Sequence, residues 1–233
     1  MMVRTTLGTS LLTAGERLPL LFLSAHGIKV IIDLHAASGS QNGQEHSSSC
    51  NGISEWAKQG GTDYLYESIM ATEFLASRYT NNQSLLGIEL LNEPSAEMVP
   101  FDVLEYYYKW SYSVIRNHTA SAYMIMCQCI RGDWTEFVNV LPADNVVLNV
   151  HLYNLFNLDL FGMTTAQWNI DFVYNDQLSL LQKLNMAGNA LIFVESEQMN
   201  GRFKLHPKMI IRSLGSSTAG VWPSDLWLGL LDI

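Results

Sequence analysis

The sequence predicts an α/β fold in which a parallel sheet closes into a (β/α)8 barrel, with the first strands missing and the last strand not identifiable. Short apolar runs alternate with amphipathic helical patterns about five times at similar intervals, which is typical of a parallel sheet. Polar residues follow several separate runs, and the carboxyl ends of barrel strands converge on one mouth. No glycine-rich phosphate loop follows any run, which argues against a doubly wound nucleotide-binding fold.

The first recognisable strand covers residues 29–35 (KVIIDLH), a β-branched run that ends in polar residues. Such a run predicts a buried parallel strand whose carboxyl end carries function. Residues 36–51 are rich in Gly, Ser, Asn and Gln and predict a long loop. A helix then begins at Thr62 or Asp63, either of which can serve as its N-cap. Its apolar residues recur three and four positions apart, at Tyr66, Ile69, Met70 and Phe74.

The next strand covers residues 86–91 (LGIELL) and is followed directly by Asn92, Glu93 and Pro94. A second helix comes after it, with residues spaced for burial against a sheet. The inner face of this helix comprises Leu104, Tyr107, Tyr108, Ser111 and Ile115.

Two further strands are predicted over residues 122–129 (AYMIMCQC) and 145–150 (NVVLNV), the second of which ends at His151. Residues 176–187 suit a helix, and Gly188 is placed to end it.

A last strand, residues 190–194 (ALIFV), ends at Glu195, and the pattern beyond it is less regular. No linker interrupts the chain, so we expect residues 26–233 to form one partial barrel domain after an atypical segment at residues 1–25. Within that segment, residues 18–25 (LPLLFLSA) resemble a short secretory h-region, although an ordinary amphipathic segment explains them equally well.

Composition excludes some classes of protein. The 233 residues are 48% hydrophobic and carry a net charge of −9, without a basic stripe, which argues against a nucleic-acid partner. No apolar run is long enough to predict a transmembrane helix.

The cysteines are too few for a disulfide framework. Cys127 and Cys129 lie in an apolar run and are expected as buried thiols, whereas Cys50 lies in a loop-like stretch. No Cys and His spacing resembles a zinc site, so no metal site is predicted.

Two glutamates stand at the ends of separate predicted strands, Glu93 and Glu195. Glycoside hydrolysis needs such a pair: one carboxyl protonates the leaving oxygen, and in retaining enzymes the other attacks the anomeric carbon. Without a motif, a glutamate at a strand end is more often a helix cap or an ion-pair partner.

The motif around Glu93 favours a catalytic role for this residue. The stretch LLGIELLNEPS resembles glycoside hydrolase family 5, in which Asn-Glu-Pro follows the fourth barrel strand. The resemblance implies that Glu93 is the acid/base and that Asn92 contacts the sugar 2-hydroxyl. In the absence of the motif, Asn92 could simply cap the following turn.

Two more stretches carry the same resemblance. HGIKVIIDLHAASGSQNGQEHS is similar to the third-strand region of the family, especially its exo-β-1,3-glucanase-like members, and implies a site role for His35. HLYNLF is similar to the sixth-strand motif and implies site roles for His151 and Tyr153. A buried core histidine remains the alternative for His35. Trp134, just beyond a strand end, is a candidate sugar platform, although packing is slightly favoured for it.

The resemblance fails in three places. The seventh-strand signature of the family is Gly-Glu-Trp, whereas this chain reads FVESEQMN, so Glu195 aligns best and Glu197 is a second candidate nucleophile. The sequence around Trp222 matches the eighth strand of the family poorly. The family also carries an arginine on its second strand that orients the nucleophile, and the residues before His26 do not resemble the first two strands.

The resemblance implies hydrolysis of a β-glucan, with a β-1,3-linked glucan favoured, by double displacement with Glu93 as acid/base and Glu195 as nucleophile. Mannan and β-1,4-glucan stay open as substrates. No metal or organic cofactor is implied, the partner is a polysaccharide, and the family resemblance implies an extracellular or cell-wall location. The alternative is a truncated, non-catalytic barrel that binds carbohydrate, or an incomplete gene model. On the missing arginine, the missing Gly-Glu-Trp signature and the unpaired strand at residues 29–35, we expect little or no hydrolase activity.

Overall fold

All five strands that the sequence predicts are present. The structure is a computed structural model that describes residues 2–8, 24–58, 63–153, 175–176, 178–187, 191–200, 203–205 and 208–211. The five strands are β2 (Lys29–Ala36), β3 (Leu85–Glu89), β4 (Tyr123–Cys127), β5 (Val146–Tyr153) and β6 (Leu191–Asn200). The last two run past their predicted ends, so His151 and Glu195 lie inside strands and not after them.

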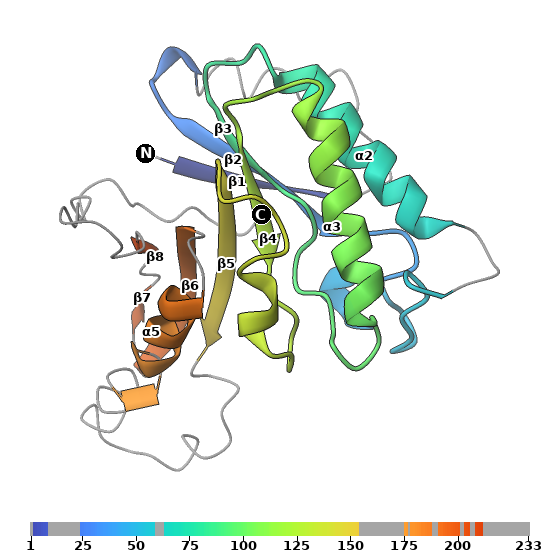
Figure 1. Ribbon diagram of the computed structural model, residues 1–233, viewed down its shortest axis with the longest axis vertical. Coiled ribbons are helices and arrows are strands. Elements are labelled where there is room, and N and C mark those ends of the chain that lie inside the picture. The colour runs from blue at the N-terminus through green and yellow to red at the C-terminus, as the bar shows by residue number, and fades with distance from the viewer. Residues whose placement is uncertain are drawn as a thin grey trace.

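The strands pair in the order in which they occur in the sequence. β1 (Met2–Gly8) through β6 form a parallel path in which each strand pairs with the next (Figure 1). Two short strands, β7 (Phe203–Leu205) and β8 (Lys208–Ile211), pair antiparallel with β6. Sequential parallel pairing places the carboxyl ends of the strands at one edge, where functional residues of barrels lie.

Strand β1 corrects the expectation for the N-terminal segment. It pairs with β2 from Met2 opposite Lys29 to Gly8 opposite Ala36, so the strand at residues 29–35 does have a neighbour. The segment MVRTTLG is short and stands without a helical pattern before it, which is why the alternation did not reveal it. β1 also contains an arginine, Arg4, whose register partner in β2 is Ile31.

Helix α2 (Tyr64–Tyr79) begins where the sequence predicts. The Asp63 side chain accepts a hydrogen bond from the Tyr66 backbone N–H at 3.0 Å, which satisfies one amide at the helix start. Of the predicted apolar face, Ile69 is buried as expected, but Tyr66, Met70 and Phe74 are 45%, 43% and 42% exposed, so the rest of that face is wrong.

Small polar residues form much of the buried face of α2. Ser68 and Thr72 are fully buried, and their hydroxyls donate to the carbonyls of Tyr64 and Ile69 at 2.8 and 2.9 Å. Ser68 also accepts a hydrogen bond from the Trp56 indole N–H at 2.9 Å. Because these hydroxyls are satisfied locally, α2 packs closely without a continuous apolar stripe.

Helix α3 (Phe101–Arg116) buries the face that the sequence predicts and lies beside α2 on one side of the sheet (Figure 1). The Tyr107 hydroxyl donates to the Leu90 carbonyl at 2.6 Å, and the Tyr108 hydroxyl donates to the Cys127 carbonyl at 2.7 Å. These two bonds tie α3 to the carboxyl ends of β3 and β4.

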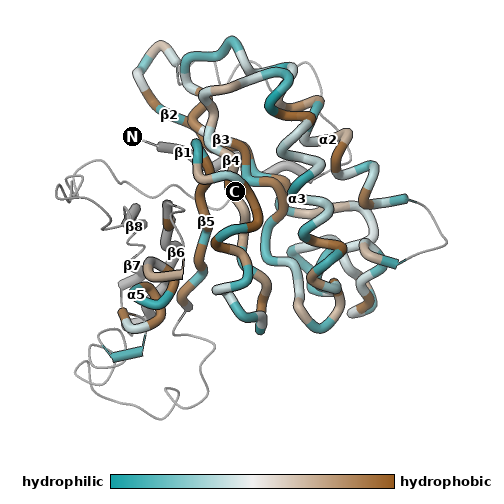
Figure 2. The backbone as a smooth tube through the Cα atoms, in the orientation of Figure 1, coloured by the Kyte–Doolittle hydropathy of each residue, from teal (hydrophilic) through white to brown (hydrophobic). Residues whose placement is uncertain are grey.

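The main core fills the space between the sheet and the helices, and apolar residues dominate the central strands (Figure 2). A smaller cluster of Ile31, Ile125 and Val147 occupies the other face of the sheet, at the beginnings of β2, β4 and β5. Residues two apart on a strand share a face. That second face therefore becomes polar toward the strand ends.

The remaining described helices are short. They are the 3-10 turns η2 (Glu45–Ser47) and η3 (Trp134–Phe137) and the helix α5 (Leu178–Ala187), which matches the predicted helix at residues 176–187. None of the helices in the described ranges has the length and apolar character needed to cross a membrane.

Candidate active site

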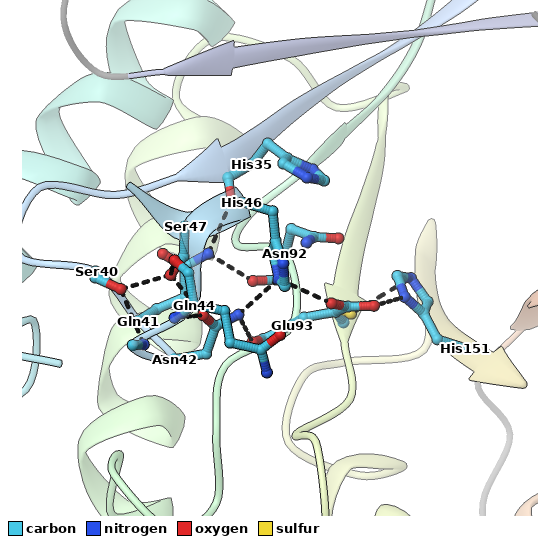
Figure 3. Close-up of polar contacts among 12 residues, drawn as sticks. His35, Ser40, Gln41, Asn42, Gln44, His46, Ser47, Asn92, Glu93 and His151 are labelled. Carbon is cyan, nitrogen blue, oxygen red and sulfur yellow. Dashed lines mark hydrogen bonds and ion pairs between the residues drawn. The ribbon is translucent and has the colours of Figure 1, made fainter. Parts of the chain in front are cut away.

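The polar residues at the strand ends converge on Glu93. Glu93 lies just beyond β3, and both of its carboxylate oxygens have histidine partners. His151 Nδ1, from β5, lies 2.5 Å from Oε1, and His46 Nε2, from the loop after β2, lies 3.1 Å from Oε2. Figure 3 shows the carboxylate held between the two rings. The Glu93 side chain is 16% exposed, so it is largely shielded but still reached by solvent.

These partners control the ionisation of Glu93. Burial raises the pKa of the Glu93 carboxyl, but hydrogen bonds from His151 and His46 outweigh burial and hold this pKa well below its ordinary value. Glu93 is therefore a carboxylate at neutral pH in this arrangement, which is the form that accepts a proton.

A second layer of buried residues fixes the His151 ring. The Asn149 side-chain amide donates to Glu89 Oε1 at 2.8 Å, and the same nitrogen lies 2.9 Å from His151 Nε2. Since an amide nitrogen carries two hydrogens and no lone pair to offer, His151 Nε2 must accept here. The ring proton is then on Nδ1, from which it is donated to Glu93.

The long loop at residues 36–51 holds the strand ends in place. The Gln41 side-chain nitrogen donates to the carbonyls of His35 and Asn92 at 2.8 and 2.7 Å, which joins the ends of β2 and β3. Asn42 donates to the Glu93 carbonyl at 2.9 Å (Figure 3). Both side chains are buried, so a stretch that reads as a flexible polar loop is an ordered support for Glu93.

The Glu93 backbone lies in the left-handed region, with φ of 42°. Non-glycine residues adopt this region rarely, and it costs of order 1–3 kcal/mol. The Asn42 bond to the Glu93 carbonyl and the ring of Pro94 restrict the backbone on the carboxyl side of Glu93. The strain is located at the residue that the sequence selects as acid/base.

His35 belongs to the same site. Its side chain is 31% exposed, so it is not the fully buried core histidine that the alternative required. Its Nδ1 lies 2.8 Å from Asp33 Oδ2, and its ring centroid lies 5.9 Å from that of His46. Asn92, by contrast, is 1% exposed.

Sequence reasoning missed His46 and Asn149. His46 lies within the stretch that carries the family resemblance, but in a loop of small polar residues nothing in its spacing set it apart. Asn149 precedes His151 by two positions, so the same-face rule for strands could have identified it.

The other sequence-predicted site residues are placed only by their backbone or lie elsewhere. Glu195 is the register partner of His151 and Glu197 that of Tyr153, while the side chains of Tyr153, Glu195 and Glu197 lie outside the described residues. Trp222 is also outside them. Trp134 begins η3 and is partly buried against the main core, in line with the packing reading.

Comparison with known proteins gives matches over most of the described chain. The model of the cellulase family, glycosyl hydrolase family 5, matches residues 22–192. A glucan 1,3-beta-glucosidase from Pichia angusta is 35% identical over 141 residues, which are 57% of this chain and 31% of the relative. Glucan 1,3-beta-glucosidase 1 from Schizosaccharomyces pombe is 30% identical over 139 residues, or 58% of this chain and 33% of the relative. The chain thus spans about a third of the length of these curated relatives.

Solved structures show the same fold at lower identity. Rutinosidase from Aspergillus niger superposes with a TM-score of 0.62 at 15% identity, covering 84% of this chain and 60% of the other. The endoglucanase Cel5A from Pseudomonas stutzeri gives a TM-score of 0.59 at 17% identity, covering 84% and 63%.

Proposed function

The chain belongs to glycosyl hydrolase family 5, and from that premise we propose that its site hydrolyses a β-glucosidic bond by a retaining mechanism with Glu93 as general acid and base. The observation that carries this proposal is the convergence of three separate segments on one carboxylate. Glu93, His46 and His151 come from the end of β3, the loop after β2 and the end of β5, yet they meet within hydrogen-bonding distance. Catalytic residues of barrel enzymes come from several strand ends in this way.

The second carboxylate of the proposed mechanism is Glu195. It would attack the anomeric carbon while Glu93 gives its proton to the leaving glycosidic oxygen, and water activated by Glu93 would then release the sugar. Support comes from the backbone, because Glu195 pairs in register with His151 on the neighbouring strand. Glu197 is two positions further along the same strand and remains the alternative nucleophile.

The ionisation of Glu93 fits the second half of this cycle directly. A carboxylate is the form that takes a proton from water. The first half needs a protonated Glu93, and a second carboxylate close to it would raise the pKa of Glu93 toward that state. Retaining enzymes place the two carboxyl groups about 5–5.5 Å apart, close enough for this effect.

For the substrate we propose a β-1,3-glucan. The support is the function of the relatives at 30–35% identity, which are glucan 1,3-beta-glucosidases. Mannan and β-1,4-glucan are the competing substrates. A polymer of this kind lies outside the cell or in its wall, and that location is part of the same proposal.

Hydrolysis is favoured here over carbohydrate binding without cleavage. The case for an inactive chain rested on a β2 strand without a neighbour, on a missing second-strand arginine and on the missing Gly-Glu-Trp signature. β1 pairs with β2 along its full length, and Arg4 stands in β1 at the register position of Ile31, two before Asp33. The first of these grounds therefore no longer holds.

Glu93→Gln tests the proposal. General acid catalysis contributes about 10²–10⁴-fold, so we expect the variant to lose that much kcat on laminarin. An aryl β-glucoside with a good leaving group needs no acid and should retain much more of its first-step rate. Added azide, which needs no general base, should restore turnover of this substrate. Glu97→Gln is the matched control, since Glu97 is a surface residue whose side chain is 59% exposed.

The stereochemistry of the first product tests the mechanism separately. A retaining enzyme releases the β-anomer first, which proton NMR detects before mutarotation. Release of the α-anomer would show inversion and exclude Glu195 as a nucleophile. Wild-type turnover of laminarin by Glu93→Gln would exclude Glu93 as acid/base.

A further inference from the structure

A buried cluster of potential metal ligands lies directly beneath Glu93. The carboxylate of Glu89, the thiol of Cys127 and the imidazole of His151 each offer one ligand atom, and these atoms all lie within 4.8 Å of one another. The three residues are 1%, 0% and 8% exposed. They come from β3, β4 and β5, so no sequence spacing reveals the group.

We propose that Glu89, Cys127 and His151 bind a thiophilic divalent cation of the zinc class. The first support is a distance. Zinc–sulfur and zinc–nitrogen bonds of about 2.3 and 2.0–2.1 Å at a tetrahedral angle set the two ligand atoms about 3.6 Å apart. Cys127 Sγ and His151 Nε2 are 3.6 Å apart. The Glu89 carboxylate, which lies within 4.8 Å of both atoms, is the third ligand.

Asn149 offers a fourth ligand. Its amide nitrogen lies between Glu89 Oε1 and His151 Nε2, at 2.8 and 2.9 Å, where a cation would have to compete with it. The amide oxygen is buried and has no hydrogen-bond partner. Rotation of the amide by half a turn exchanges the two atoms and brings the oxygen, which can act as a ligand, to face the cation.

The outer contacts also suit a cation. Metal-bound histidines almost always donate their other ring N–H to a carboxylate or carbonyl, which fixes the ring and strengthens its basicity. His151 has this arrangement already, because Nε2 faces Cys127 while Nδ1 lies 2.5 Å from Glu93 Oε1. The cation would therefore bind without breaking the contact between His151 and Glu93.

Binding displaces one proton. Burial raises the pKa of the Cys127 thiol, so the thiol is protonated before the cation arrives. The sulfur–hydrogen bond breaks, a sulfur–metal bond forms, and the proton leaves to solvent. The divalent cation adds two positive charges and the departing proton removes one. The site beneath Glu93 therefore gains one positive charge.

Cobalt(II) as a spectroscopic substitute for zinc tests binding without reference to activity. We expect the whole chain, kept reduced by a phosphine, to take up one Co²⁺. It should develop a thiolate-to-cobalt charge-transfer band together with intense visible bands of four-coordinate cobalt, and zinc should bleach both. Cys127→Ser should abolish the charge-transfer band and weaken binding by about 100-fold or more, beyond the loss typical of an outer contact. Cys129→Ser, a buried thiol two positions on and outside the cluster, should bind Co²⁺ as the wild type does.

Glu89→Gln is a second variant, in case Cys127→Ser does not fold. We expect it to bind Co²⁺ more weakly but to keep the thiolate-to-cobalt band, because Cys127 is unchanged. A band that persists in Cys127→Ser, a band that is lost in Cys129→Ser, or no band in the wild type would overturn the site. Hydrolysis without any cobalt band would reject the cation site and leave the proposed function standing.

Discussion

The Asn149 side chain determines which nitrogen of His151 carries the proton, and through His151 it reaches Glu93. It acts from within the sheet, with no exposed surface of its own. A single series of hydrogen bonds, of 2.8, 2.9 and 2.5 Å, runs from Glu89 through Asn149 and His151 to Glu93. In such a series a change of one donor alters the next link as well.

Asn149→Asp keeps the shape of the side chain but removes both N–H donors. His151 Nε2 then gains a proton to donate to the new carboxylate, so ¹⁵N-labelled imidazole shifts should change from one protonated nitrogen to two. We expect kcat to fall roughly tenfold or more, because a misplaced catalytic group costs up to about 100-fold. Asn139→Asp, at an exposed position bonded to the Ala187 carbonyl, should change neither quantity. Unchanged His151 shifts in Asn149→Asp would refute the assigned tautomer.

Among the connecting elements, the loop at residues 36–51 carries the most structural information. Its side chains bond to backbone groups on two strand ends, and Ser54 from beyond the loop donates to the Ser40 carbonyl at 2.6 Å. The ordered loop therefore fixes the backbone of Asn92 and Glu93.

Gln41→Ala removes the donor to the His35 and Asn92 carbonyls and the acceptor of the Ala37 amide. Each buried group left unsatisfied costs about 1–3 kcal/mol, so we expect a loss of at least that in the free energy of unfolding. Catalysis should fall too, since Glu93 depends on the same loop. Urea denaturation and laminarin assays measure the two effects. Gln44→Ala is the matched control, because Gln44 is exposed and its described hydrogen bonds use its backbone; an equal loss there would refute the argument.

At the opposite end of the strands, Arg116 closes helix α3 onto the sheet. Its guanidinium donates to the carbonyls of Thr119, Ala122, Asp144 and Asn145 at 2.9–3.3 Å. The amino ends of barrel strands contribute stability and not chemistry.

We therefore expect Arg116→Ala to lower the free energy of unfolding by about 1–3 kcal/mol while kcat stays within twofold of wild type. Arg131→Ala removes a surface ion pair with Glu97, whose side chains are 72% and 59% exposed, and should cost less than about 0.5 kcal/mol. Denaturant titration of both variants checks this. A large activity loss in folded Arg116→Ala would contradict the division between the two ends.

The elements differ in how far the sequence could predict them. β-branched runs and the face of α3 follow simple periodicity, and both are confirmed. Helix α2 defeated the same rule because Ser68 and Thr72 satisfy their hydroxyls within the helix, which the apolar pattern does not register. Glu93 and His151 were predictable from motifs. His46 was not, because only the folded loop brings it across to Glu93.

For the molecule as a whole, the ladder from β1 to β6 predicts a gradient of protection. β3 and β4 have paired neighbours on both sides and fully buried residues such as Ile88 and Met124, whereas β1 pairs with β2 alone among the described strands. Hydrogen exchange by mass spectrometry should find the slowest amides at residues 85–89 and 123–127 and intermediate protection at residues 2–8. Exchange at residues 2–8 as fast as in an unfolded peptide would mean that β1 does not pair with β2.

The sequential strand order has a consequence for how the protein is made. During synthesis each parallel strand leaves the ribosome after the strand on which it docks. The sheet can therefore grow by one strand at a time. The Glu93 carboxylate emerges early with His46, but its second partner follows 58 residues later. A nascent chain that ends before β5 therefore carries Glu93 without its His151 partner. Translation pauses before residue 151 would prolong that vulnerable interval, and chaperone binding should be strongest there.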